Sequence, residues 1–312
     1  MLGLAGCATP QTDALRAGIR SGTAAGIHAA HRIEGVPYFA QEHEQCGPAT
    51  LAMALGASGI AADPDELRAS VYTPGRGGSL APEMLAAARR RGGLALALDG
   101  TLAAVLREVD AGHPVIVLQN LGLWFYPVWH YAVVIGYDLP GDAVILHSGP
   151  QRAAPMALEL FERTWARSGY WAMVALAPQD LPVTARSADL VEAGAALERV
   201  DAHAARTAYE AITHRQPDSF GAWIGLGNSA YALGDAAGAG AAFAQATLLQ
   251  PGSADAWNNL AGARLKEGAL GPARAAIARA LALGGEHGAV YAQTAAEIEQ
   301  AGADRPGAPL AP

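Results

Sequence analysis

Lysine is almost absent from this sequence, and positive charge is scarce overall. Lys266 is the only lysine, and 21 basic residues are outnumbered by 29 acidic ones, which gives a formal net charge of −8. No cluster of basic residues is present, so the sequence lacks the electrostatic footprint of a nucleic-acid-binding protein. It also has no run of about 20 apolar residues, the length that a membrane-spanning helix requires.

Cysteine is the second scarcity. Cys7 and Cys46 are the only two, so they can form at most one disulfide and cannot supply a zinc site alone. His28, His31 and His43 lie near one another in the sequence but without a metal-ligand spacing, and we predict no metal or other cofactor. Hydrophobic residues make up 51% of the 312 residues, which is ample for about two folded domains.

The residues that end at Cys7 form a candidate lipidation signal. Leu4-Ala5-Gly6-Cys7 resembles the lipobox of bacterial lipoproteins, in which the cysteine thiol becomes acylated. This resemblance implies a lipid anchor at Cys7, and Ala8 after it implies the periplasmic face of the outer membrane. A charged n-region and a long apolar stretch normally precede a lipobox. We therefore expect either that the natural start codon lies upstream or that the signal was trimmed, and we interpret residues 1–34 as a lipobox remnant and a tether.

Residues 35–178 predict one mixed domain with helices first and strands later. Proline, capping and glycine signals predict four helices, alternating or continuous apolar runs then predict strands, and a fifth helix precedes the last strand. This order is typical of an α+β domain. One predicted helix starts near Cys46, and the others cover 63–70, 79–91, 99–111 and 157–166. The predicted strands cover 115–119, 130–137, 143–147 and 170–177.

Cys46 and His130 are the candidate reactive pair. Cys46 precedes Pro48 at a predicted helix start, where free backbone N–H groups favour the nucleophilic thiolate. His130 begins an apolar strand, where packing can fix its ring as the base that the thiol needs. Each residue also has a plainer interpretation, because a buried cysteine or a strand histidine is often only part of the core.

Two motifs in this region resemble a known family. They are Cys46-Gly47-Pro48-Ala49, preceded by Val36-Pro37-Tyr38 and a glutamine, and His130-Tyr131-Ala132-Val133-Val134. Together they resemble the papain-like cysteine peptidase domain that processes bacteriocins with double-glycine leaders. The resemblance implies a papain-like fold and peptide-bond hydrolysis over residues 35–178. It implies Cys46 as the nucleophile, His130 as general base and acid, and Gln41 as the oxyanion donor together with the Cys46 N–H.

The third member of the resembled triad, an aspartate before proline, is missing. Ser148 falls nearest its position, and one residue of ambiguity leaves His147 open. A serine hydroxyl can accept the Nδ1–H of His130 and fix the ring tautomer, but it stabilises an imidazolium less than a carboxylate does. Nearby, Trp124, Tyr126 and Trp129 are interpreted either as a substrate groove or as core or membrane-proximal packing.

The second half of the chain repeats with a period of 34 residues. Trp223 and Trp257 are one period apart, and so are Phe243 and Ile277. The period and its small and aromatic positions resemble the tetratricopeptide repeat. We therefore predict all-α repeats over residues 187–300 that bind a peptide or protein partner, followed by a disordered tail over 301–312.

Three functions are compatible with these features. The first is an exported, lipid-anchored cysteine peptidase with a repeat module. The second is a catalytically weak or inactive peptidase-fold scaffold that binds peptides, which the missing aspartate favours. The third is a transferase with the same Cys–His chemistry, in which an amine replaces water.

Overall fold

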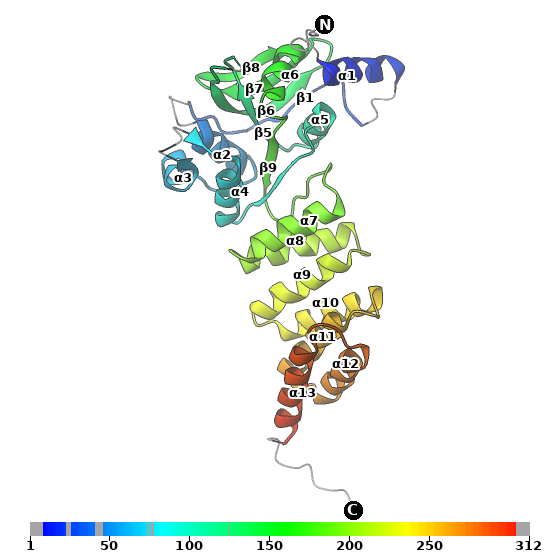
Figure 1. Ribbon diagram of the computed structural model, residues 1–312. Helices are drawn as coiled ribbons and strands as arrows, with labels where there is room; N and C mark the ends of the chain where they lie inside the picture. Colours follow the sequence, from blue (N-terminus) through cyan, green and yellow to red (C-terminus); the bar gives the residue numbers. More distant parts are fainter. Residues whose placement is uncertain are drawn as a thin grey trace, which may run out of the picture. The chain divides into compact units, whose positions relative to one another are not determined.

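The computed structural model describes residues 9–22, 26–40, 46–73, 75, 78–123 and 125–303, which form two compact units divided after Ala193. Cys7, Gln41, His43, Trp124 and residues 304–312 lie outside the described residues. Figure 1 shows a sheet with helices in the first unit and helices alone in the second. None of the described helices is long and apolar enough to cross a membrane.

An antiparallel sheet forms the centre of the first unit, with the strand order β4-β9-β5-β6-β7-β8. The short strand β1 pairs with the far end of β6, so β6 pairs first with β5 and then with β1 on one side, and with β7 on the other side from Val133 onward. The remaining two strands, β2 and β3, pair separately. The strands are β1 Ala30–Arg32, β2 Tyr72–Thr73, β3 Gly78–Ser79, β4 Leu94–Ala97, β5 Val115–Asn120, β6 Trp129–Asp138, β7 Ala143–Ser148, β8 Gln151–Ala157 and β9 Ala172–Leu176.

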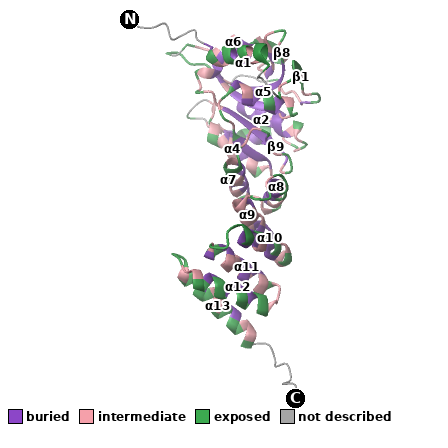
Figure 2. Ribbon diagram, turned by 90° about the vertical axis from the view of Figure 1, so that its right-hand side faces the viewer, coloured by how far each residue is buried: buried purple, intermediate pink, exposed green. Residues whose placement is uncertain are grey.

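Helices cover the sheet of the first unit, and buried residues fill the space between them (Figure 2). The helix α2 is buried over most of its length and shares one core with Tyr131, Val133 and Ile135 of β6. The helices α5 and α6 contact β5 and β6 as well. The helices of this unit are α1 Pro10–Ser21, α2 Cys46–Ala57, α3 Pro64–Val71, α4 Ala81–Arg90, α5 Leu102–Asp110 and α6 Leu158–Ala166, and α7 Ser187–Glu198 spans the division.

The predicted α+β arrangement is present in this unit, and local signals fixed several element ends. Asp63 caps α3 by accepting from the N–H groups of Asp65 and Glu66. Thr101 caps α5 in the same way. The helix therefore begins at Leu102, three residues after the start expected at Asp99. Each of the predicted helices and strands is found within a few residues of its expected place.

The interpretation of residues 1–34 as a tether is wrong for the described part. Residues 10–21 form the helix α1, and Ala30–Arg32 form β1. The buried carboxylate of Glu162 accepts the backbone N–H groups of Gln11 and Thr12 at 2.9 and 2.6 Å. Because a helix start has free N–H groups and a partial positive charge, this carboxylate stabilises α1. The Ala- and Gly-rich sequence does not reveal a partner 150 residues away.

The strand β8 was also not predicted. It contains Pro155, which cannot donate a ladder hydrogen bond, and it has few β-branched residues. It lies at the edge of the sheet, paired only with β7, which is where a strand tolerates proline. Register and position in the sheet, which the sequence pattern does not contain, therefore decide this element.

The second unit is helical, and its helix ends repeat with the 34-residue period. The helix α11 starts and ends 34 residues after α9, and α12 does so relative to α10. Trp223 and Trp257 make equivalent hydrogen bonds from Nε1 to the carbonyls of Pro217 and Pro251, at 2.8 and 3.0 Å. The remaining helices are α8 Ala202–Arg215, α9 Phe220–Ala232, α10 Ala236–Leu249, α11 Ala254–Lys266, α12 Leu270–Leu283 and α13 Gly288–Ala303.

Small residues let these helices pack closely. A Cβ added to Gly225 would lie about 2.0 Å from the ring of Tyr209, and one added to Gly227 would lie about 2.4 Å from the ring of Phe243. Residues 301–303, placed in the disordered tail by the sequence interpretation, instead end α13.

Candidate functional site

Cys46 is the first residue of α2, as the sequence predicted. The helix behind it is anchored in the core, since Leu51, Met53 and Leu55 are fully buried. Gly47 is required at the next position, because a Cβ there would lie 2.1 Å from Oγ of Ser79. The packing therefore holds the start of α2, and with it the thiol, against β3.

His130 and Ser148 lie together at the ends of neighbouring strands. Nε2 of His130 is 2.9 Å from Oγ of Ser148, which places the predicted third residue beside the ring. The prediction that Nδ1 of His130 makes this contact is wrong, because the ring presents Nε2 to Ser148. With Nε2 directed to Ser148, Nδ1 is the nitrogen that remains for the thiol.

His147 has a different environment and does not contact His130. It is 2% exposed, its ring lies 5.2 Å from the ring of Tyr38, and its Nδ1 accepts the N–H of Ala153 at 3.0 Å. Burial lowers the pKa of this ring. The alternation of side chains along β7 separates the two candidates, so Ser148 is the one that could orient His130.

The backbone of β6 connects His130 to the thiol. The backbone N–H of Tyr131, the residue after His130, lies close enough to the Cys46 sulfur to lower the pKa of the thiol, against the larger effect of burial. The Tyr131 hydroxyl in turn donates to the carbonyl of Ser79 at 3.1 Å, beside Gly47. No hydrogen bond joins the thiol to the His130 ring among the residues that the structure describes. Sequence reasoning missed the Tyr131 donor, because a backbone group carries no sequence signal.

Both candidate reactive groups are biased towards their neutral forms. Burial raises the pKa of the Cys46 thiol, although the N–H groups of Tyr131 and Gly47 oppose this effect. Burial also lowers the pKa of His130. Desolvation disfavours a charged group in either case. Burial thus opposes the thiolate that the helix N-terminus was expected to favour.

The aromatic residues before His130 are exposed rather than packed in the core. Tyr126 and Trp129 have exposed fractions of 74% and 52%. Tyr126 belongs to the connection between β5 and β6, together with exposed Phe125, and Trp129 is the first residue of β6. The core interpretation of Tyr126 and Trp129 is thus wrong, and Trp124 lies outside the described residues.

The other charged candidates have structural partners. His28 is paired with Asp110 at 2.8 Å, and Asp142 accepts two hydrogen bonds from Arg16. Within the described ranges, no group of three or more His, Cys, Asp or Glu side chains could hold a metal ion.

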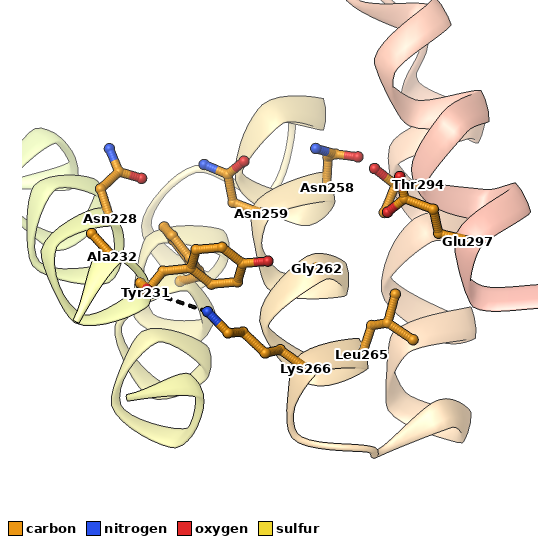
Figure 3. Close-up of a pocket in the computed structure, with 11 residues that line it drawn as sticks. Asn228, Tyr231, Ala232, Asn258, Asn259, Gly262, Leu265, Lys266, Thr294 and Glu297 are labelled. Carbon is orange, nitrogen blue, oxygen red and sulfur yellow. Dashed lines mark hydrogen bonds between the residues drawn. The ribbon is translucent and has the colours of Figure 1, made fainter. Parts of the chain in front are cut away.

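The second unit contains a separate cavity of about 680 Å³. The side chains labelled in Figure 3 belong to α9, α11 and α13, and Phe243 of α10 also lines the cavity. Lys266 lies 4.2 Å from the centre of the Tyr231 ring, and its Nζ donates to the Tyr231 carbonyl at 3.3 Å. The polar lining residues are Asn228, Asn258, Asn259, Lys266, Thr294 and Glu297.

Sequence analysis did not identify this cavity. The available signal was the single lysine, with asparagines on nearby turns of helices otherwise rich in alanine. Oδ1 of Asn258 is buried without a hydrogen-bond partner within the described chain. The cavity therefore offers amide groups and one charge of each sign.

Comparisons with known proteins find similarity over part of the chain. No curated protein was found to match the sequence. Among solved structures, a protein from Bacillus anthracis described as a "putative C39-like peptidase" is 19% identical, with a TM-score of 0.41, covering 48% of this chain and 98% of its own. A family model described as "Peptidase_C39 like family" matches residues 33–173. Over those residues the chain is similar to this family and has a cysteine-peptidase-like fold.

Proposed function

We propose that the chain is a cysteine peptidase whose reactive residues are Cys46 and His130. One observation carries the proposal: Cys46 begins α2 with its sulfur near the backbone N–H of Tyr131, and the preceding residue, His130, has its Nε2 2.9 Å from Oγ of Ser148. A buried thiol, a positioned imidazole and a hydroxyl that fixes the imidazole are the parts that acyl transfer requires. The match of residues 33–173 to a C39-like peptidase family supports the same chemistry.

The proposed reaction is acyl transfer to water. The Cys46 sulfur attacks the amide carbonyl carbon while Nδ1 of His130 takes the thiol proton. The C–N bond then breaks as His130 returns that proton to the leaving amine. Water, deprotonated by His130, finally attacks the thioester and releases the acid and the free thiol. The N–H of Cys46 and the side chain of Gln41 are the proposed donors to the oxyanion.

The neutral pair gives this mechanism a particular order. Because burial raises the pKa of the thiol and lowers the pKa of the imidazole, the proton moves as the sulfur attacks, rather than before substrate binds. The thiol and the ring are not hydrogen-bonded in the free protein. Catalytic contacts of this kind commonly tighten only when substrate is bound.

Cleavage of a peptide library tests the proposal. Wild-type protein should produce new peptide termini detectable by mass spectrometry, and Cys46→Ala and His130→Ala should abolish them. His214→Ala, at an exposed position of the helical unit, is the matched control and should retain the activity. Cleavage that persists in Cys46→Ala would show that the thiol is not the nucleophile.

Thiol labelling tests the neutral pair independently of substrate. In the Cys7→Ser variant, iodoacetamide should modify Cys46 slowly at neutral pH. The modification should become fast only at a pH above the pKa of an ordinary thiol, which is about 8.5. Fast labelling in mild acid that His130→Ala slows would instead show a preformed thiolate–imidazolium pair.

Two further parts of the proposal concern location and partner. Acylation at Cys7 would anchor the protein at the periplasmic face of the outer membrane, which the lipobox resemblance supports. The second unit would bind a peptide or protein partner, which the 34-residue period and the polar cavity support. Metabolic labelling with a fatty acid, lost in Cys7→Ser, checks the anchor.

A peptide-binding scaffold is the second candidate function. The absence of a carboxylate beside His130 favours it, since Ser148 supplies no charge to stabilise an imidazolium. Peptide binding that Cys46→Ala leaves unchanged, without turnover by the wild type, would support the scaffold. If turnover is found, product analysis with an added amine separates hydrolysis from transfer.

A further inference from the structure

The connection between β5 and β6 presents an exposed apolar surface, which we call the apolar hairpin. It comprises the described residues Leu121–Leu123 and Phe125–Trp129. Not one of these residues has a charged side chain, and six of them are large, hydrophobic and exposed: Leu121, Leu123, Phe125, Tyr126, Val128 and Trp129. Soluble proteins rarely expose contiguous apolar patches without a binding role.

The backbone of the apolar hairpin is largely hydrogen-bonded within the hairpin itself. Leu123 and Tyr126 exchange N–H···O bonds of 3.1 and 3.2 Å, and Leu121 donates to the carbonyl of Val128 at 2.9 Å. Oδ1 of Asn120 accepts the N–H groups of Gly122 and Val128. A segment can enter a lipid environment only if its backbone groups are paired in this way.

A chain of contacts places the hairpin at the same end of the unit as the start of α1. Arg167, directly after α6, donates to the carbonyls of Asn120 and Gly122 at the base of the hairpin. Five residues earlier, and about 8 Å along the helix, Glu162 of α6 caps the start of α1. Figure 1 shows α1 beside α6, and contacts between them agree.

The hydrogen bonds between α1 and α6 define the direction of α1. Thr12 bonds to Glu162 and Arg16 bonds to Glu159, so α1 runs antiparallel to α6. The first residue of α1 is therefore nearest to the end of α6 that holds the hairpin. In the sequence, Cys7 precedes Thr9 by two positions.

We propose that the apolar hairpin inserts into the interfacial region of a lipid bilayer beside an acyl chain on Cys7, as a second membrane contact of this protein. Its aromatic and aliphatic side chains would enter the headgroup boundary, where tyrosine and tryptophan are favoured. The hairpin would be an apolar contact in addition to the lipid on Cys7. The orientation argument rests on the proposed acylation of Cys7.

Partition into vesicles tests the insertion without using peptidase activity. Full-length Cys7→Ser protein, which lacks the acyl chain, is mixed with neutral phosphatidylcholine vesicles, because the net charge of −8 disfavours electrostatic attraction. It should bind, and adding Leu123→Ser and Phe125→Ser should lower its partition coefficient at least about tenfold. The matched control adds Leu248→Ser and Val290→Ser, at exposed apolar positions of the second unit, and should change nothing.

Quenching by brominated lipid tests the insertion in the acylated protein. The loss of tryptophan fluorescence on such vesicles should be smaller in Trp129→Phe than in wild type. In Trp257→Phe the loss should equal that of the wild type. Equal partition of the hairpin and control variants, or no quenching from Trp129, would overturn the proposal. So would a hairpin variant that raises KM for soluble peptides but partitions normally, since the hairpin would then bind substrate. Normal partition by Cys46→Ala would show that insertion holds even if the peptidase proposal fails.

Discussion

The hydroxyl of Ser148 supplies the hydrogen bond but not the charge of a complete triad. It lies 2.9 Å from Nε2 of His130, so it can orient the ring. Nothing in this contact offsets the effect of burial, which lowers the pKa of His130. In the proposed mechanism His130 therefore remains a competent base in mildly acidic solution, since it stays unprotonated there.

Replacing this serine by aspartate should shift the acidic limb of the activity profile. A carboxylate beside Nε2 favours the imidazolium, so Ser148→Asp should raise the pKa of His130 by about one unit or more. Activity would then begin to fall at a higher pH as the solution is acidified. NMR titration of the ring measures the same pKa directly. An unchanged titration, with Ser148→Ala also without effect, would show that residue 148 does not interact with the ring in solution.

Predictability of the site differs from one residue to the next. Cys46, His130 and Ser148 could be identified because their residue types and order carry the chemistry. The ring nitrogen that meets Ser148 could not, since it depends on a rotamer and on the twist of two strands. The neutral state of the pair was also missed, because burial is a property of the folded chain.

At the scale of elements, α1 shows the limit of local patterns. Helices α3 and α5 carry their own caps, Asp63 and Thr101, and were predictable. The cap of α1 comes from Glu162 in another helix, and the strand β8 takes its place from its partner β7. Sequence therefore predicted the elements with local signals and missed those that tertiary contacts stabilise.

Removing the cap of α1 should destabilise the first unit. Glu162→Gln replaces a buried carboxylate, which accepts two backbone N–H groups, with an amide that has only one acceptor oxygen. The expected cost is about 1–3 kcal/mol in the free energy of unfolding, with faster amide exchange in residues 10–21. Urea denaturation and hydrogen exchange measure both effects. The control Glu159→Gln, at a half-exposed ion pair, should cost less than about 1 kcal/mol; an equal cost would contradict the capping role.

A second buried carboxylate predicts acid sensitivity. Burial raises the pKa of Glu108, but hydrogen bonds from His113 and Thr184 outweigh this and hold the pKa below its ordinary value. A depressed folded-state pKa stabilises the fold above the unfolded value, about 4.3, and this contribution is lost as pH falls through the folded pKa. As the pH is lowered, the free energy of unfolding should therefore decline less steeply in Glu108→Gln than in the wild type. Exposed Glu34→Gln should follow the wild type, and identical slopes for all three proteins would contradict the prediction.

At the scale of the whole molecule, charge and apolar surface act in opposite directions on membrane binding. The net charge of −8 repels anionic lipid, whereas the apolar hairpin favours any bilayer. Binding of the Cys7→Ser protein to vesicles that contain phosphatidylglycerol should therefore strengthen as salt is added, because the screening length falls from about 30 Å at 0.01 M to about 10 Å at 0.1 M. Sedimentation at several salt concentrations measures this trend. Binding that weakens with salt would show a basic contact instead.

The short distance between Cys7 and α1 has a consequence for how far the protein can reach. Enzymes on long flexible linkers sample a thick layer of solution above the membrane. Here a single residue, Ala8, separates the proposed acyl site from Thr9, which is buried at the start of a docked helix. An anchored first unit would search a layer little thicker than itself. Its substrates would then be chosen by their residence near the lipid surface, in addition to their sequence.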